Sequence, residues 1–192
     1  MRPNFLAYFG VAISAIVGVT PAFSAESQQV TFQGSPVKIM GKFLSVGEKA
    51  PDFKLVDGDL NEVTLSKWHG KRKILNIFVS SDTPVCDASI RKFNETASNL
   101  KNTVIIGISS DLPFAQKRFC SANGINNVYM LSDFRSPSFG RDYGVMISDG
   151  PLRELLTRAV VVLDENDRVI YRQMVSEITQ EPDYQKVIDS LK

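Results

Sequence analysis

The chain's only two cysteines, Cys86 and Cys120, lie in surroundings that are typical of redox chemistry. An apolar run over residues 74–79 comes shortly before Cys86, which predicts a buried strand that turns into a helix. With Thr83 as the helix N-cap, Pro84 takes the first helical position and Cys86 the third. Free backbone N–H groups and the positive end of the helix are within reach there, so the sequence predicts a stabilised thiolate at Cys86.

A basic partner should assist this thiolate, because the neighbouring Asp87 carries a negative charge that disfavours it. Arg158, at the start of an apolar stretch over residues 158–163, is the best candidate. A fast reaction also needs hydrogen-bond donors where charge develops in the transition state. The hydroxyl of Thr83 and the guanidinium of Arg158 can supply them, so we place both with Cys86 in the candidate catalytic site.

Two other hypotheses account for the cysteines. A structural disulfide is common in exported proteins, and bridging Cys86 and Cys120 would restrict the unfolded chain by roughly 3.8 kcal/mol in the entropy model. It would suit a non-enzymatic domain that uses the bridge as a staple. A thiol–disulfide oxidoreductase acting on proteins is disfavoured, because such enzymes use C-x-x-C and these thiols are 34 positions apart. The setting of Cys86 favours a redox couple.

The elements that must position these residues alternate between strands and helices. Gly34-Ser35 between two short apolar segments predicts an N-terminal β-hairpin over residues 30–39. Apolar patterns predict strands at residues 53–56, 62–65, 73–79, 103–108, 128–131, 158–163 and 169–174. Helices are predicted at residues 84–100, at 112–123 with Asp111 as the cap, at 138–143 as one turn, and at 182–191.

The order of these elements is that of a thioredoxin-like α/β fold. Connections of about 12 to 17 residues that carry a helix require parallel pairing of the early strands. The last two strands are separated by a turn over residues 164–167 and are expected to pair antiparallel. We therefore expect a central mixed sheet flanked by helices, preceded by the N-terminal hairpin.

Several segments of the chain resemble the peroxiredoxins. Thr83-Pro84-Val85-Cys86 resembles the T-x-x-C core of their active site. The segment that ends in Cys120, SDLPFAQKRFC, closely resembles the resolving-cysteine helix of the thiol peroxidases, which are atypical two-cysteine peroxiredoxins. The early hairpin, RAVVVLD at residues 158–164 and EPDY at residues 181–184 also match, so the resemblance covers residues 30–192. Two positions depart from it: Val79 replaces a proline that helps to shield the cysteine, and Pro84 a residue that is often small.

The resemblance implies a thiol-dependent peroxidase. Cys86 would be the peroxidatic cysteine, whose thiolate attacks a hydroperoxide and becomes a sulfenic acid. Cys120 would be the resolving cysteine that forms an intramolecular disulfide with it, and Thr83 and Arg158 would hold the thiolate and polarise the peroxide. A thioredoxin-like protein would reduce the disulfide. Relatives of this kind are typically homodimers, often prefer organic hydroperoxides to hydrogen peroxide, and need no cofactor.

Composition and charge exclude several other classes. Without Arg2, which lies in the N-terminal segment discussed next, the chain has 21 basic and 21 acidic residues, so nothing predicts nucleic acid or an anionic membrane as a partner. The single histidine, His69, is expected to be structural, and one histidine with two distant cysteines does not make a zinc site. Residues 164–167 lack the ligand pattern of a calcium loop.

The first residues have the parts of a secretory signal peptide. Arg2 precedes an uncharged apolar stretch over residues 5–19, and small residues Ala22 and Ser24 suit cleavage after Ser24. An uncleaved membrane anchor is the alternative, but this stretch is shorter than the roughly 20 residues that span a bilayer. We therefore expect a signal peptide at residues 1–24, one peroxiredoxin domain at residues 25–192 without membrane insertion, and export, most simply to the periplasm.

Overall fold

The computed structural model describes residues 29–192, and the predicted signal peptide lies outside them. The strands are β1 (Val30–Phe32), β2 (Ser35–Val37), β3 (Ile39–Met40), β4 (Lys54–Val56), β5 (Glu62–Thr64), β6 (Arg72–Ile77), β7 (Thr103–Ser109), β8 (Val128–Ser132), β9 (Met146–Ile147), β10 (Ala159–Leu163) and β11 (Val169–Met174). The helices are η1 (Leu65–Trp68), a 3₁₀-helix, and α1 (Pro84–Ala97), α2 (Pro113–Asn123), α3 (Ser138–Asp142) and α4 (Tyr184–Asp189).

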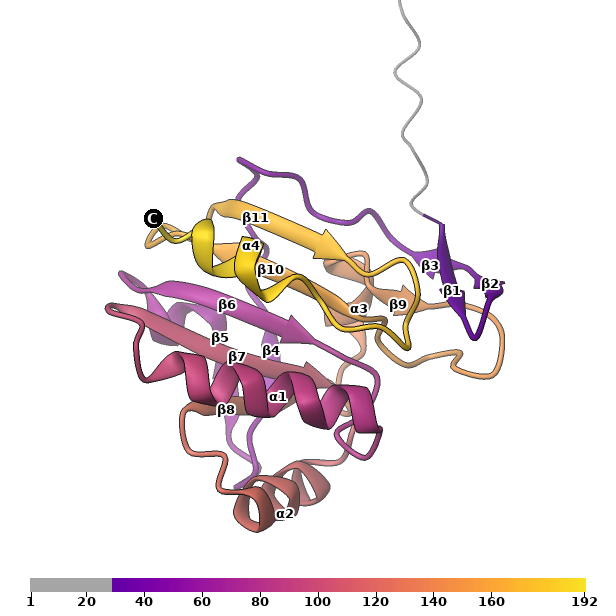
Figure 1. Cartoon of the computed structure of the whole chain (residues 1–192), viewed down its shortest axis with the longest axis horizontal. Coiled ribbons are helices and arrows are strands. Elements are labelled where there is room, and N and C mark those ends of the chain that lie inside the picture. The colour runs from indigo at the N-terminus through magenta and orange to yellow at the C-terminus, as the bar shows by residue number, and fades with distance from the viewer. Residues whose placement is uncertain (1–28) are drawn as a thin grey trace, which may run out of the picture.

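A mixed sheet of seven strands in the order β11-β10-β6-β7-β8-β4-β5 forms the centre of the molecule (Figure 1). Strands β6, β7 and β8 run parallel, as the helical connections between them require. Strand β10 pairs antiparallel with β6, and β11 with β10. The predicted thioredoxin-like fold, with its mixed sheet and N-terminal hairpin β1-β2, is confirmed.

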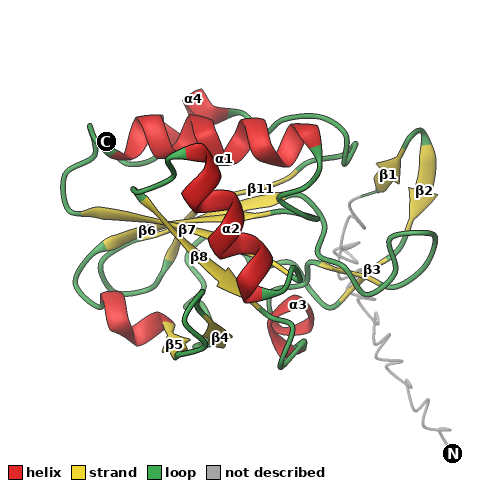
Figure 2. Cartoon of the chain, turned by 90° about the horizontal axis from the view of Figure 1, so that it is seen from below, coloured by secondary structure: helices red, strands yellow, loops and turns green. Residues whose placement is uncertain are grey.

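Helices cover both faces of the sheet (Figure 2): α1 and α4 lie together on one face and α3 lies on the other. The rings of Phe93 on α1 and Tyr184 on α4 meet edge to face, with centroids 5.3 Å apart. The continuous apolar residues of β6, β7 and β10 are buried because both faces of these strands are covered. Among residues 29–192, no helix is long and apolar enough to cross a membrane.

Several element boundaries differ from the sequence prediction. Helix α1 ends at Ala97 rather than at residue 100. Asp111 was expected to cap α2, but Leu112 is the N-cap and no side chain caps this helix end. The carboxylate of Asp111 instead accepts hydrogen bonds from Ser81 and Ser109. The short pair β3-β9 was not predicted, because two-residue strands carry almost no periodic signal.

Candidate active site

Cys86 lies at the third position of α1, where the sequence places it, and its side chain is completely buried. The chain turns tightly between β6 and α1: the backbone N–H of Thr83 donates to the carbonyl of Ser80 at 3.1 Å. Pro84 occupies the first helical position, and the N–H of Asp87 closes the first helical turn on the carbonyl of Thr83 at 3.0 Å. This strand–turn–helix unit therefore delivers the sulfur to the sheet's carboxyl edge.

Arg158 supplies the positive charge beside Cys86. Its Nη2 lies 3.3 Å from Cys86 Sγ, and the arginine is only 2% exposed. The antiparallel pairing of β10 with β6 explains the meeting, since Ala159 stands opposite Ile77, where β6 ends and the turn to α1 begins. Arg158 Nε donates to the carbonyl of Ile178 at 2.9 Å, whereas Nη1 has no partner among the described residues.

Thr83 is the N-cap of α1 by position, but its hydroxyl does not cap the helix. Oγ1 donates to the carbonyl of Ser80 at 3.0 Å, so the hydroxyl hydrogen is engaged there. The oxygen keeps its lone pairs and can still accept a hydrogen bond. In this conformation Thr83 therefore offers an acceptor rather than the donor that the sequence predicted.

The negative charge of Asp87 is compensated within the same helix. Arg91 Nε donates to Asp87 Oδ1 at 2.6 Å, one turn further along α1. The same guanidinium bonds Asn123 at the end of α2. The repulsion that Asp87 was expected to exert on a thiolate at Cys86 is thus reduced by a partner that sequence analysis missed, although the i,i+4 spacing of an acid and a base on a helix is a readable signal.

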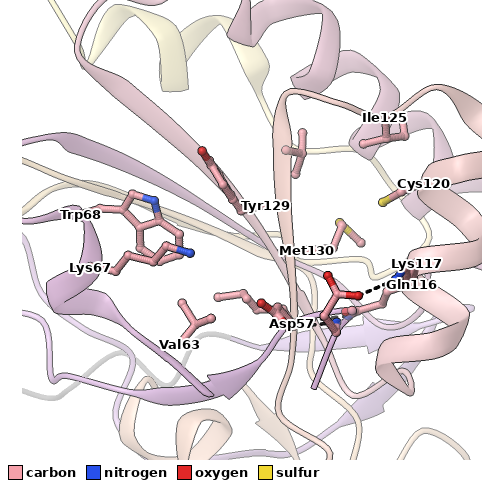
Figure 3. A pocket seen from close by; sticks show the side chains of 14 residues that line it. Asp57, Val63, Lys67, Trp68, Gln116, Lys117, Cys120, Ile125, Tyr129 and Met130 are labelled. Carbon is pink, nitrogen blue, oxygen red and sulfur yellow. Dashed lines mark hydrogen bonds and ion pairs between the residues drawn. The ribbon is translucent and has the colours of Figure 1, made fainter. Parts of the chain in front are cut away.

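Cys120 lies in a different environment from Cys86. Its half-buried thiol, on α2, lines a cavity of about 240 Å³ between α2, β8 and the β4-β5 hairpin. Figure 3 shows the side chain pointing toward Met130 of β8, with Trp68 further along the cavity. Burial raises the pKa of Cys120 to about 11, so it is a neutral thiol at physiological pH. Both cysteines are free, and Cys86 is not among the residues that line this cavity.

A partly buried polar network links the start of α2 to the turn before α1. Asp111 Oδ2 accepts hydrogen bonds from the backbone N–H of Ser81 at 2.8 Å, from the hydroxyl of Ser81 at 3.0 Å and from the hydroxyl of Ser109 at 2.9 Å. Gln116 Nε2 donates to Ser109 Oγ at 2.9 Å and so adds the first turns of α2 to the network. The carboxylate of Asp111, two residues before α2, therefore ties the turn that precedes α1 to the end of β7.

His69, which was expected to be structural, follows η1 with its side chain 73% exposed, and its Nδ1 lies 4.0 Å from Asp167 Oδ2. Within residues 29–192, no group of three or more histidine, cysteine, aspartate or glutamate side chains could hold a metal ion.

Comparison with known proteins agrees with this fold. Residues 45–188 match the redoxin family. The thiol peroxidase of Staphylococcus haemolyticus is 46% identical over 164 residues, which are 85% of this chain and 98% of that protein. The solved peroxiredoxin-like protein of Aquifex aeolicus is 39% identical, with a TM-score of 0.81 over 85% of this chain and 95% of that one. The solved thiol peroxidase of Chromobacterium violaceum, at 23% identity, has the same fold, with a TM-score of 0.81 over 86% of this chain and 96% of that one.

The class of protein follows from these matches and from the buried cysteine at the start of α1: this is a thioredoxin-like redox domain. The chain belongs to the redoxin family and, within it, to the thiol peroxidases. The resemblance found in the sequence is thus confirmed. The chain is an enzyme, a thiol-dependent peroxidase.

Proposed function

We propose that Cys86 is the peroxidatic cysteine and Cys120 the resolving cysteine of this peroxidase. The observation that carries the assignment is the contact of 3.3 Å between Arg158 Nη2 and Cys86 Sγ in a buried site. A buried guanidinium attracts the thiolate strongly, because little water screens the two charges. Cys120, by contrast, is half-buried, and no cation offsets the effect of burial on its pKa. It therefore stays a neutral thiol, which fits a resolving cysteine that reacts only after Cys86 has been oxidised.

In the first step the Cys86 thiolate attacks the terminal oxygen of a hydroperoxide and breaks the O–O bond. The sulfur is oxidised to sulfenic acid, and the other oxygen leaves as an alkoxide or hydroxide that takes up a proton. Arg158 Nη1, which lacks a partner among the described residues, is available to bond the peroxide oxygens as charge develops. Thr83 Oγ1 can accept the O–H of the hydroperoxide, since its own hydrogen is directed to Ser80.

In the second step the Cys120 thiol attacks the sulfenic acid, an S–S bond forms and water leaves. Cys86 is fully buried, and Cys120 lines a cavity that Cys86 does not reach. The start of α1 and the last turns of α2, which carry the two cysteines, must therefore rearrange before the sulfurs meet. A dithiol reductant of the thioredoxin type then exchanges with the disulfide. It restores both thiols and becomes oxidised itself. No metal or organic cofactor takes part in this cycle.

We further propose export of the mature chain, residues 25–192, to the periplasm, a preference for organic hydroperoxides, and a homodimer. Export follows from the N-terminal sequence and requires a reductant outside the cytoplasm. An apolar surface supports the dimer: Leu112, Phe114 and Phe134 are 56%, 61% and 40% exposed around the start of α2. Sedimentation of the wild type and of Phe114→Glu tests the dimer, and a monomeric wild type would contradict it.

The function is tested on reduced protein that begins at Ala25, mixed with one equivalent of cumene hydroperoxide. Intact mass and peptide mapping should show rapid loss of two hydrogens and a link between Cys86 and Cys120. Cys86→Ser should abolish peroxide consumption, whereas Cys120→Ser should consume one equivalent and accumulate the sulfenic acid. Two unmodified thiols in the wild type after minutes would instead favour the structural-disulfide hypothesis.

A further inference from the structure

A backbone carbonyl between β11 and α4 orients the guanidinium of Arg158. Arg158 Nε bonds the carbonyl of Ile178, in the segment between β11 and α4. This segment has no helix or strand of its own to fix the carbonyl. Its neighbour Glu177, however, accepts more hydrogen bonds than any other carboxylate among the described residues.

The partners of Glu177 come from the N-terminal hairpin and from its own loop. Oε2 accepts from Thr31 Oγ1 at 2.8 Å and from the N–H of Gly34 at 3.0 Å. Oε1 accepts from the N–H of Gln33 at 3.1 Å and from the N–H and hydroxyl of Thr179 at 3.1 and 2.7 Å. The hydrogen bonds, the one from Gly34 first, lower the pKa of Glu177 to about 2, so it is ionised throughout the physiological range.

The hairpin turn is shaped for this carboxylate. Gln33 and Gly34 both have positive φ angles, 51° and 78°, as a tight two-residue hairpin turn requires. Two successive backbone N–H groups thereby face the same anion.

Backbone bonds continue the tie to the residue that holds Arg158. The N–H of Thr31 donates to the carbonyl of Ser176 at 2.7 Å, and the N–H of Ile178 donates back to the carbonyl of Thr31 at 2.9 Å. The backbone of Thr31 is therefore hydrogen-bonded to both residues that flank Glu177. A continuous chain of contacts runs from the hairpin through Glu177 and Ile178 to Arg158 and Cys86.

We infer that Glu177 is a positioning residue for the peroxidatic reaction: by fixing the hairpin to the 176–179 loop, it holds the Ile178 carbonyl that aims Arg158 at Cys86. This inference rests on the proposed roles of Arg158 and Cys86. It also assigns a function to the β1-β2 hairpin, which lies outside the seven-stranded sheet (Figure 1).

Stopped-flow mixing of reduced protein with cumene hydroperoxide tests this by separating sulfenic acid formation from disulfide formation. Glu177→Ala should lower the second-order rate constant of the first step about tenfold, which corresponds to roughly 1.4 kcal/mol in the barrier. The rate of disulfide formation should stay within about twofold of the wild type. Glu177→Gln keeps one oxygen with two lone pairs that can accept hydrogen bonds, so its rate constant should fall less. This variant replaces Glu177→Ala in the experiment if the alanine variant folds poorly.

The matched control is Asp164→Ala. Asp164 also closes a turn with its carboxylate, accepting from the N–H groups of Asn166 and Arg168 at 2.8 Å each, but it lies at the opposite end of β10 from Arg158. Its peroxide rate constant should equal that of the wild type.

A double-mutant cycle with Arg158→Lys distinguishes positioning from general destabilisation. If Glu177 acts through Arg158, Glu177→Ala should cost little further in the Arg158→Lys background. An unchanged rate constant in Glu177→Ala, or the same tenfold loss in both backgrounds, would overturn the inference and leave the proposed function intact. A wild type that does not consume hydroperoxide would overturn the proposed function itself.

Discussion

Arg158 contacts Cys86 through Nη2, and its Nη1 is buried without a partner among the described residues. A lysine at this position would keep the positive charge but lose the planar guanidinium, whose two Nη atoms can donate to two groups at once. We therefore expect Arg158→Lys to lower the rate constant for sulfenic acid formation roughly 100-fold, the usual cost of losing one preorganised donor. Stopped-flow kinetics with hydroperoxide measures it. A rate within threefold of the wild type would show that charge alone is sufficient.

The two thiols differ because of their surroundings, and Cys120 can be tested separately. Burial raises the pKa of Cys120 to about 11. In a Cys86→Ser variant, where Cys120 is the only cysteine, the rate of alkylation by iodoacetamide should keep rising with pH and show no plateau below pH 10. A free cysteine-containing peptide, which should level off above about pH 8.5, is the control. A plateau near pH 8.5 in the protein would mean that the thiol is effectively exposed.

At the scale of elements, the proposed disulfide requires the start of α1, which carries Cys86, to move out of its packed position toward Cys120 in the last turns of α2. Asp111 opposes this, because its carboxylate bonds both the backbone and the hydroxyl of Ser81 before α1. Hydrogen bonds to a charged group contribute about 1.5–3 kcal/mol. Asp111→Asn should therefore speed up disulfide formation by up to about tenfold and leave the peroxide step nearly unchanged.

Tryptophan fluorescence can follow this opening, since Trp68 is the chain's only tryptophan and lines the same cavity as Cys120. Asp189→Asn is the control, because this exposed carboxylate pairs with Lys192 at the end of α4. Equal disulfide rates in the wild type and Asp111→Asn would show that the Ser81–Asp111 bonds do not limit the opening.

At the scale of the whole molecule, Asp133 couples stability to pH. Asp133 directly follows β8 and is only 3% exposed. Burial raises its pKa from 3.8 to about 6. The folded state then holds a proton that the unfolded state releases between about pH 3.8 and 6. The contribution of Asp133 to stability is therefore greatest below this window and is lost as the pH rises through it.

An amide avoids this loss, so Asp133→Asn should raise the free energy of unfolding at pH 7 by up to roughly 3 kcal/mol and have little effect at pH 4. Urea unfolding of both proteins at the two pH values measures the difference. Equal destabilisation by the substitution at pH 4 and pH 7 would contradict the prediction.

The amino-acid sequence was sufficient for what depends on neighbouring residues. The apolar run, Thr83 and Pro84 specify a strand, a tight turn and a helix start, and these alone put Cys86 at the third helical position. The hairpin over β1 and β2 and most element boundaries follow from local patterns in the same way. Family motifs then connected the two cysteines to peroxidase chemistry.

Only the tertiary structure decided which distant groups meet. Arg158 reaches Cys86 across 72 positions because β10 runs antiparallel beside β6 and starts where β6 ends. Asp111 was wrongly predicted as a helix cap, since its best donors lie on a turn 30 positions away and a local pattern cannot reveal them. Glu177 likewise meets the N-terminal hairpin 143 to 146 positions away. Strand pairing and burial, which depend on the whole chain, selected these contacts.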